Sequence, residues 1–216
     1  IERGLDAMKL ECEDLLFDNV SELCSSAVRG CLVAEKGNKL VVADLSNIEG
    51  RVLSWVAGED WKVEAFYAFD RGVGHDLYKI TAGRILNKDP VDITKDERQV
   101  SGKVPELACG YQGSVGAFAT MGAIYGVVMP EEEALDIVHA WRAQHPMIVN
   151  LWYDVERAAI KALKQEDSVF AVRSLRIAVK DWQGSKWLCI KLPSGRYLCY
   201  PNAHLDWERK LASGLT

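Results

Sequence analysis

Residues 39–51 read Lys-Leu-Val-Val-Ala-Asp-Leu-Ser-Asn-Ile-Glu-Gly-Arg, and this stretch joins two kinds of structure. The apolar, β-branched run that ends at Asp44 predicts a buried strand. The residues after it have a helical pattern, so a helix is expected over about 48–57. An acid at the exposed end of a strand can be presented to a divalent cation, and Glu49 follows on the first helical turn. We therefore expect metal-assisted phosphoryl chemistry on nucleotides, with Asp44 as a metal ligand.

Turn residues and a change of period predict the elements on either side. Residues 35–38, Glu-Lys-Gly-Asn, predict a hairpin turn between strands at 31–34 and 39–44, because Gly and Asn tolerate positive φ. After Asp167 the apolar period changes from 3.6 to 2, which predicts antiparallel strands. These strands are expected at 173–182, 186–192 and 196–200. The helices are expected at about 6–17, 48–57, 60–70, 76–86, 95–109, 113–126, from 131 onward and at 146–163.

The order of these elements predicts an α+β fold. Strands from both ends of the chain are expected to form one antiparallel sheet, with the helices between them as a separate lobe. We place the boundaries at 1–58, 59–168 and 169–216, where the first and last segments contribute the sheet and the middle segment the helical lobe.

Composition places the chain among globular proteins. It has 216 residues, 49% of them hydrophobic, enough for a sizeable core, and the tryptophans are expected in that core. The six cysteines include no Cys-x-x-Cys pair, which favours reduced thiols in a cytosolic protein. No signal peptide or membrane-length apolar run is present. The net charge of −5 counts mildly against a stand-alone nucleic-acid-binding module.

The helix expected at 95–109 has an unusual face. Gln99, Lys103 and Leu107 recur every four residues and therefore lie on one side, and Tyr111 continues the same stripe. This combination suits a nucleoside triphosphate, because an ammonium meets phosphate, an apolar chain packs on the sugar or base, and a ring offers a stacking surface. We expect this stripe and Asp44 to face one another across a cleft that admits a nucleotide.

Two motifs carry a resemblance to a known family. Residues 42–53 resemble motif A of the family A (DNA polymerase I-like) DNA polymerases, whose pattern is Asp-Tyr-Ser-Gln-Ile-Glu-x-Arg. Lys103-x-x-x-Leu107-x-x-x-Tyr111 resembles motif B, Arg-x-x-x-Lys-x-x-x-Phe-Gly-x-x-Tyr-Gly. The sequences of residues 110–113 and 192–196 are most similar to those of the bacteriophage and prophage branch. The similarity runs from about Ser25 to Pro201 and implies part of a palm with an inserted, mostly helical fingers lobe.

The resemblance implies roles for individual residues. Asp44 would be one of two aspartates that hold a pair of catalytic Mg²⁺ ions. Glu49 would hydrogen-bond Tyr111 and exclude a ribose 2′-hydroxyl. Lys103 would be a catalytic residue with Asp44, contacting the triphosphate and protonating the pyrophosphate. Leu107 stands at the position that sets tolerance of dideoxynucleotides. The remaining residues of the implied deoxynucleotide site are Asn47, Tyr78, Arg98 and Gln99, and the implied DNA contacts are Arg29 and Arg51.

The implied partners are a DNA template-primer and deoxynucleoside triphosphates. The implied location is the cytoplasm of a bacterial host, with no membrane partner. The sequence does not indicate an oligomeric state.

The motif B segment departs from the family pattern in one respect. The family's arginine precedes its lysine by four residues, whereas Arg98 precedes Lys103 by five. On a regular α-helix this spacing turns Arg98 about 140° away from Lys103. Pro105 also removes a hydrogen bond to residue 101 inside the same helix. A π-bulge or kink around residues 101–102 would absorb the extra residue and return Arg98 to the Lys103 face.

A second departure concerns the second metal-binding aspartate. The family carries it in a His-Asp-Glu motif downstream of motif B, and this tripeptide does not occur in the 216 residues. His204-Leu205-Asp206-Trp207-Glu208 has the wrong spacing. The sequence is therefore interpreted as a palm-fingers fragment of a polymerase that is inactive by itself.

Three alternatives are weaker. The chain could be a non-catalytic DNA- or nucleotide-binding prophage remnant. It could be a relative of single-subunit RNA polymerases, although Glu49 argues against this because RNA synthesis must admit the 2′-hydroxyl. An unrelated metal hydrolase would need more acids or histidines beside Asp44.

Overall fold

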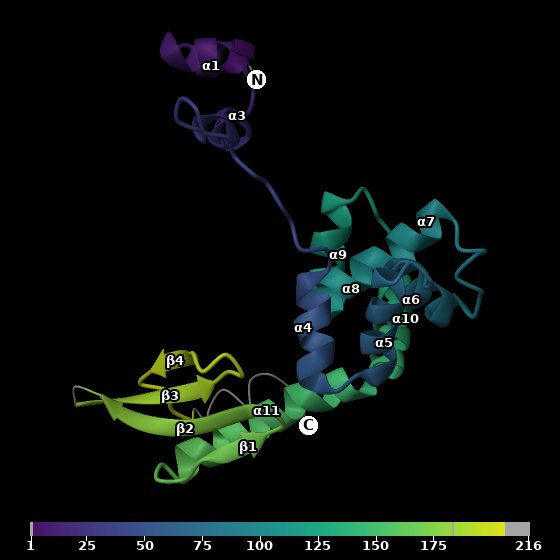
Figure 1. The fold of residues 1–216 in the computed structure, drawn as a ribbon, viewed down its shortest axis with the longest axis vertical. Coiled ribbons are helices and arrows are strands. Elements are labelled where there is room, and N and C mark those ends of the chain that lie inside the picture. The colour runs from purple at the N-terminus through teal and green to yellow at the C-terminus, as the bar shows by residue number, and fades with distance from the viewer. Residues whose placement is uncertain (1, 183, 206–216) are drawn as a thin grey trace. The chain divides into compact units, whose positions relative to one another are not determined.

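The computed structural model describes residues 2–182 and 184–205. The chain divides into a first unit, residues 1–46, and a second unit, residues 47–216. Helices come first in chain order and a four-stranded antiparallel sheet follows them, which confirms the predicted α+β class (Figure 1).

The first unit contains short helices. They are α1 (Glu2–Lys9), α2 (Glu13–Leu16), α3 (Val20–Ala27) and the 3-10 turn η1 (Val28–Cys31). The expected single helix over 6–17 is wrong, because the chain leaves the helix after Lys9 and Glu11 adopts a φ of 53°. Helix α3 is not among the expected helices. Its N-cap is Asn19, whose side chain accepts a hydrogen bond from the Glu22 amide at 3.0 Å, an ordinary helix cap.

Residues 32–45 form a turn but no strands. The hairpin prediction is therefore correct for the turn and wrong for the two strands. The Asn38 amide donates to the Glu35 carbonyl at 2.9 Å, and Gly37 has a φ of 89°, as the turn requires. The flanking runs form no ladder, and Val41 and Val42 are 82% and 92% exposed. A two-stranded ribbon is marginal unless its apolar face packs on something. Among the described residues of the first unit nothing covers that face, and the segment is not part of the sheet.

The second unit begins with helices whose ends agree with the predictions. They are α4 (Ile48–Ala57), α5 (Asp60–Asp70), α6 (Leu77–Leu86), α7 (Lys95–Glu97), the π-helix η2 (Arg98–Lys103), α8 (Val104–Cys109), α9 (Val115–Ile124), α10 (Glu131–Gln144) and α11 (Pro146–Lys164). Thr94 and Glu97 form a capping box at the start of α7. Segments α7, η2 and α8 follow one another without a break.

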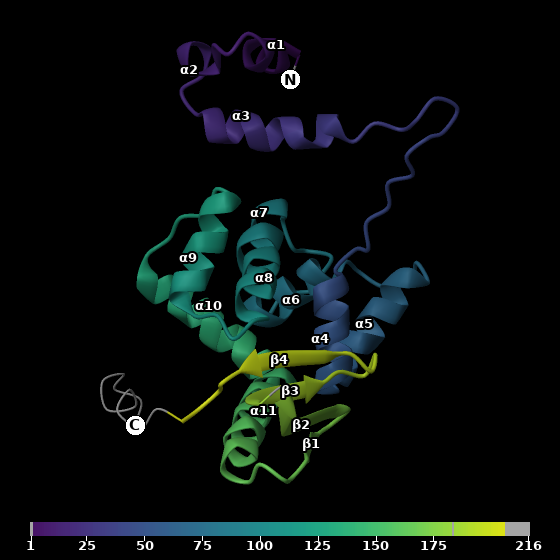
Figure 2. The ribbon, with the colours of Figure 1, turned by 90° about the vertical axis from the view of Figure 1, so that its left-hand side faces the viewer.

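The sheet has the strand order β1-β2-β3-β4, and every neighbouring pair is antiparallel. Its strands are β1 (Phe170–Val172), β2 (Leu175–Trp182), β3 (Ser185–Lys191) and β4 (Tyr197–Pro201). The last three confirm the predicted strands, and β1 was missed because it is only three residues long. Helix α11 packs against β1 and β2 on one face of the sheet (Figure 2).

One hydrophobic core joins the helices and the sheet of the second unit. Trp141 and Ile148 are fully buried in it, and Ile177 contributes from β2. The expectation that tryptophans lie in the core holds for Trp141, whereas Trp55 and Trp182 are 59% and 60% exposed. Among the described residues, no helix combines the length and the apolar character needed to cross a membrane.

Candidate functional site

The segment that carries Lys103 contains a π turn at the predicted place. Residues 98–103 are π-helical, and the Val104 amide donates to the Gln99 carbonyl five residues earlier. A π turn brings residues five apart, rather than four, into line along the helix. Pro105 follows at the start of α8, where it is accommodated directly after the π turn. The π-helical backbone of residues 98–103 thus accommodates the five-residue interval between Arg98 and Lys103.

Arg98 lies against α6 rather than in bulk solvent. Its guanidinium forms an ion pair with the Asp76 carboxylate and lies over the Tyr78 ring, 4.9 Å from the ring centroid. Asp76 also caps α6, accepting a hydrogen bond from the Tyr78 amide at 3.2 Å. The structure therefore brings together Arg98 and Tyr78, two residues of the expected nucleotide site, and adds Asp76.

Lys103 contacts a residue that the motifs do not contain. Its ammonium lies 3.9 Å from the centroid of the Tyr125 ring, at the end of α9. Such a cation–π contact holds a half-buried lysine in one position at modest energy. An aromatic residue after a Gly/Ala-rich helix gives no motif, so sequence reasoning missed Tyr125.

Glu49 and Tyr111 meet although they lie far apart in the sequence. Partial burial, together with a hydrogen bond to the Glu49 carboxylate and its charge, raises the pKa of Tyr111. Tyr111 is 71% exposed, so its ring is open to a ligand. Leu107 and Gln99, from the same helical segment as Lys103, are half-buried. Asn47 precedes α4 with a left-handed φ of 54° and accepts the Arg51 amide at its carbonyl.

The remaining expected site residues are Arg51, Asp44 and Arg29. Arg51 donates two hydrogen bonds to Asp70, at 2.7 and 2.8 Å, and its guanidinium lies over the Phe66 ring. Asp44 is exposed in the first unit and Arg29 belongs to η1 of that unit, with its side chain outside the described residues. Because the two units are described separately, the expectation that Asp44 faces Lys103 stays a prediction.

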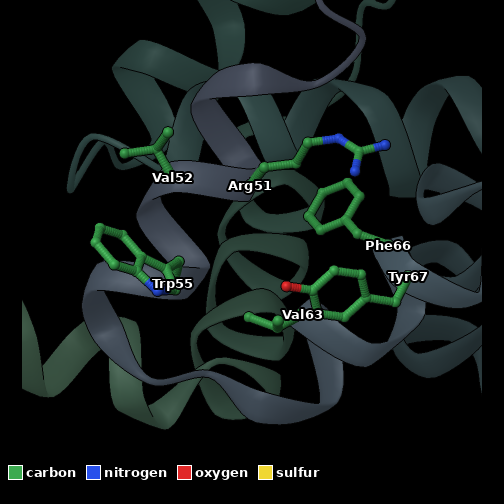
Figure 3. Close-up of a pocket in the computed structure, with 6 residues that line it drawn as sticks. All are labelled: Arg51, Val52, Trp55, Val63, Phe66 and Tyr67. Carbon is green, nitrogen blue, oxygen red and sulfur yellow. The ribbon is translucent and has the colours of Figure 1, made fainter. Parts of the chain in front are cut away.

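An open hollow of about 230 Å³ lies between α4 and α5. Its walls are mostly apolar and aromatic, with Arg51 at the top of the view in Figure 3. The lining residues are Arg51, Val52, Trp55, Val63, Phe66 and Tyr67. Trp55 and Tyr67 are both more than half exposed, so the hollow can stack a planar group, but no sequence motif marked it.

A buried cluster of polar side chains surrounds Glu106 of α8. The Lys62 ammonium donates to Glu106 Oε2 at 2.5 Å and lies 3.2 Å from His145 Nε2. Glu106 Oε1 accepts from the Thr81 hydroxyl at 2.7 Å and from the Trp141 indole at 3.2 Å. Lys62 and His145 are fully buried. Such a pair is tolerated because the remaining carboxylate lone pairs also have donors.

The hydrogen bonds of His145 define its neutral form. Nδ1 lies 2.7 Å from the Trp141 carbonyl oxygen, which can only accept, so Nδ1 carries the proton. Nε2 is then free to accept from Lys62. Burial lowers the pKa of His145, which is consistent with a neutral ring. Burial is the largest single influence and opposes the charge on Glu106, but the Lys62 charge and hydrogen bond together with His145 outweigh it, and the pKa of Glu106 is lowered.

We expect the free energy of unfolding to fall as the pH is lowered. The unfolded chain protonates His145 below about pH 6.5, which the folded chain resists, and stability is lost by up to about 1.4 kcal/mol per pH unit. Below about pH 4.3 the unfolded chain also protonates Glu106, and the loss steepens. Urea unfolding between pH 7.5 and 4 measures both steps.

The matched variants for this experiment are His145→Asn and His139→Asn, because His139 is exposed. The first is expected to flatten the pH dependence between pH 7 and 5, and the second to leave it unchanged. An unaltered slope in His145→Asn would contradict the assignment.

Glu106 could have been noticed in the sequence. It follows Pro105 and stands one turn before Cys109, both of which are buried, so it interrupts the inward face of the helix. Its partners Lys62 and His145 come from distant helices and give no local pattern. No group of three or more His, Cys, Asp or Glu side chains that could hold a metal occurs in the part of the chain that the structure describes.

Comparison with known proteins gives three relatives, whereas no family model matches the sequence. The chain is 38% identical over 217 residues to the DNA polymerase of Bacillus phage SP02, which covers 94% of this chain and 32% of that protein. It is 33% identical over 108 residues to DNA polymerase I of Aquifex aeolicus (strain VF5), covering 50% of the chain and 18% of the relative.

The third relative is DNA polymerase I of Chloroflexus aurantiacus, 35% identical over 74 residues, or 34% of this chain and 7% of the relative. The chain thus spans about a third of the length of the phage polymerase and less of the other two.

Proposed function

We propose, from the premise that this chain is a homologous segment of the family A (DNA polymerase I-like) DNA polymerases, that it selects and binds the incoming deoxynucleotide in template-directed DNA synthesis. The whole reaction would transfer a deoxynucleotide to a primer 3′-hydroxyl paired with a template. Residues 1–58 and 169–216 would belong to the palm and residues 59–168 to the fingers. The identity with a Bacillus phage polymerase makes the cytoplasm of a bacterial host the proposed location.

The observation that carries this proposal is the meeting of Glu49 with Tyr111. Glu49 belongs to the motif A segment and lies on α4, and Tyr111 ends the motif B stripe after α8. Two motifs recognised separately in the sequence therefore supply neighbouring side chains within the second unit. A carboxylate against an exposed ring leaves little space beside a bound sugar, so the pair would reject a ribose 2′-hydroxyl.

The cations of the same region would bind the triphosphate. Lys103 is held over the Tyr125 ring, a weak contact that a phosphate can replace with a charge-assisted hydrogen bond. Arg98 would turn from Asp76 toward phosphate, supported by Tyr78. The other residues proposed for the deoxynucleotide are Asn47, Gln99 and Leu107, and those proposed for DNA are Arg29 and Arg51.

Mg²⁺ is the metal that the family relationship implies, and a carboxylate is the oxygen ligand it prefers. The described residues do not gather several such ligands in one place, and Asp44 is the carboxylate that motif A contributes. The residues present therefore do not fit a complete metal site. We propose Asp44 as one ligand and derive no step through the metal.

We expect Lys103→Ala to weaken deoxynucleotide binding to this chain. Loss of a charge-assisted contact to phosphate should raise the Kd about 10- to 100-fold. Titration with dGTP, followed by calorimetry, measures this. Lys95→Ala, on exposed α7 of the same helical segment, is the matched control and should bind as the wild type does. Equal binding by Lys103→Ala would remove Lys103 from the site.

The 216-residue chain alone is expected not to extend a primer at the rate of an intact polymerase. A two-metal site needs carboxylates that flank both ions, and this sequence offers Asp44 without a His-Asp-Glu motif. A gel assay with a labelled primer-template, dNTPs and Mg²⁺ tests this. Extension at a rate near that of a complete family A enzyme would contradict the proposal.

A further inference from the structure

Two thiols face each other across the edge of the sheet. Cys189 of β3 and Cys199 of β4 are direct cross-strand partners, and their sulfur atoms lie 3.9 Å apart. Neither residue belongs to the motifs that point to polymerase function. Both thiols are free in the structure.

The register places this pair where a disulfide can form. At one end of the hairpin the Leu192 amide donates to the Arg196 carbonyl, and at the other the Asn202 amide donates to the Lys186 carbonyl. In an antiparallel ladder, bonded and non-bonded pairs alternate, so Ile190 and Leu198 form a bonded pair and Cys189 and Cys199 a non-bonded one. Non-bonded partners have Cα atoms about 4.5 Å apart, within the range that disulfides span.

The pair is open to reagents on one side. Ile190 points into the core beneath the sheet, so its neighbour Cys189 points to the opposite face, away from α11. Cys189 is buried and Cys199 is exposed. Burial raises the pKa of Cys189, so Cys199 is the thiol that meets an oxidant first.

The other cysteines of the chain differ from this pair. Cys109 is buried in the helical core, and burial raises its pKa to about 12. Cys12, Cys24 and Cys31 belong to the first unit, where Cys24 and Cys31 are exposed.

We propose that Cys189 and Cys199 are a redox-active dithiol that closes to a reversible disulfide between β3 and β4 when the chain meets a small-molecule disulfide. The proposal rests on the hairpin alone and is independent of polymerase function. Residues 189–199 form the hairpin that the bond would close, and every residue of β4 is exposed. The disulfide would therefore link the edge strand β4 covalently to its neighbour β3.

The chemistry is two successive thiol–disulfide exchanges. The Cys199 thiolate attacks one sulfur of oxidised glutathione, forms a mixed disulfide and releases one glutathione thiolate. Cys189 then loses its proton to solvent, attacks the Cys199 sulfur and releases the second glutathione thiolate. Two protein thiols are oxidised and one glutathione disulfide is reduced to two thiols.

The experiment uses the full chain with Cys12, Cys24 and Cys31 replaced by serine, which removes competing exposed thiols. The reduced protein is incubated with oxidised and reduced glutathione, quenched with an alkylating agent and analysed by intact mass and peptide mapping. We expect the loss of two hydrogens, a peptide pair joined through Cys189 and Cys199, and internal disulfide about tenfold or more in excess of the mixed disulfide. Dithiothreitol should restore both thiols.

The variants Cys189→Ser and Cys199→Ser separate the steps. Cys189→Ser should stop at the mixed disulfide on Cys199, and Cys199→Ser should react far more slowly because its remaining thiol is buried. Circular dichroism confirms that each variant is folded. A mixed disulfide as the main product of the protein that keeps both thiols, or a bond that joins two molecules, would overturn the proposal.

Discussion

Replacing Lys62 by methionine is expected to lower the free energy of unfolding by about 3–5 kcal/mol. The substitution keeps the length of the side chain but removes the charge that faces Glu106, whose side chain is only 5% exposed. The carboxylate would then be buried without a cation, and the neutral His145 cannot replace the ammonium. Urea unfolding at pH 7.5, followed by tryptophan fluorescence, measures the difference.

The chain offers a matched surface pair for comparison. Lys88 and Glu97 also form an ion pair, but their side chains are 48% and 25% exposed. Lys88→Met should cost less than about 1 kcal/mol because solvent screens an exposed pair. Similar losses in the two variants would contradict the importance of burial.

A double variant separates the lost charge from lost packing. In Lys62→Met/Glu106→Gln the amide oxygen can still accept from Thr81 and Trp141, and no buried charge remains. We expect it to regain at least half of the stability lost in Lys62→Met. A double variant as unstable as Lys62→Met would show that packing of the lysine stem is what matters.

Gly102→Ala is expected to destabilise the protein by about 2–3 kcal/mol, although alanine is the better helix former. A Cβ at residue 102 would lie 2.1 Å from the Tyr78 carbonyl oxygen. That oxygen belongs to the backbone of α6, so relief requires η2 and α6 to separate. The same movement would disturb the ion pair between Arg98 and Asp76. Chemical unfolding of the variant measures the loss.

Gly50→Ala is the control for this prediction. Gly50 also lies inside a helix, but a Cβ there would meet only the Phe66 ring at 3.6 Å, an ordinary contact. This substitution should stabilise the protein by up to about 1 kcal/mol. If both alanine variants were stabilised, the close approach of η2 to α6 would be refuted.

Local sequence patterns predicted the elements whose structure depends on residues close together in the chain. The bounds of α4 and α5 were predicted from the local sequence pattern, and the capping box at Thr94 forms between residues three apart. The π turn was also predictable, because the interval between Arg98 and Lys103 and the position of Pro105 both disagree with a regular α-helix. The β2–β4 meander followed from alternation and its turns.

Local sequence patterns could not predict contacts between residues that are far apart in the chain. The apolar run before Asp44 predicted a strand, but a strand exists only where another strand or a packed surface receives it. The cluster around Glu106 depends on Lys62 and His145, which reach it from other helices. Tyr125 joins Lys103 only through the packing of α9 beside α8.

The π turn at residues 98–103 has a consequence for how sequences of this family should be aligned. A one-residue deletion between Arg98 and Lys103 would convert the turn to regular α-helix and leave both side chains on the same side. Homologues with four-residue and five-residue intervals can therefore share one three-dimensional arrangement. A single gap belongs at this point, and alignments that move it elsewhere would pair residues that are not spatially equivalent.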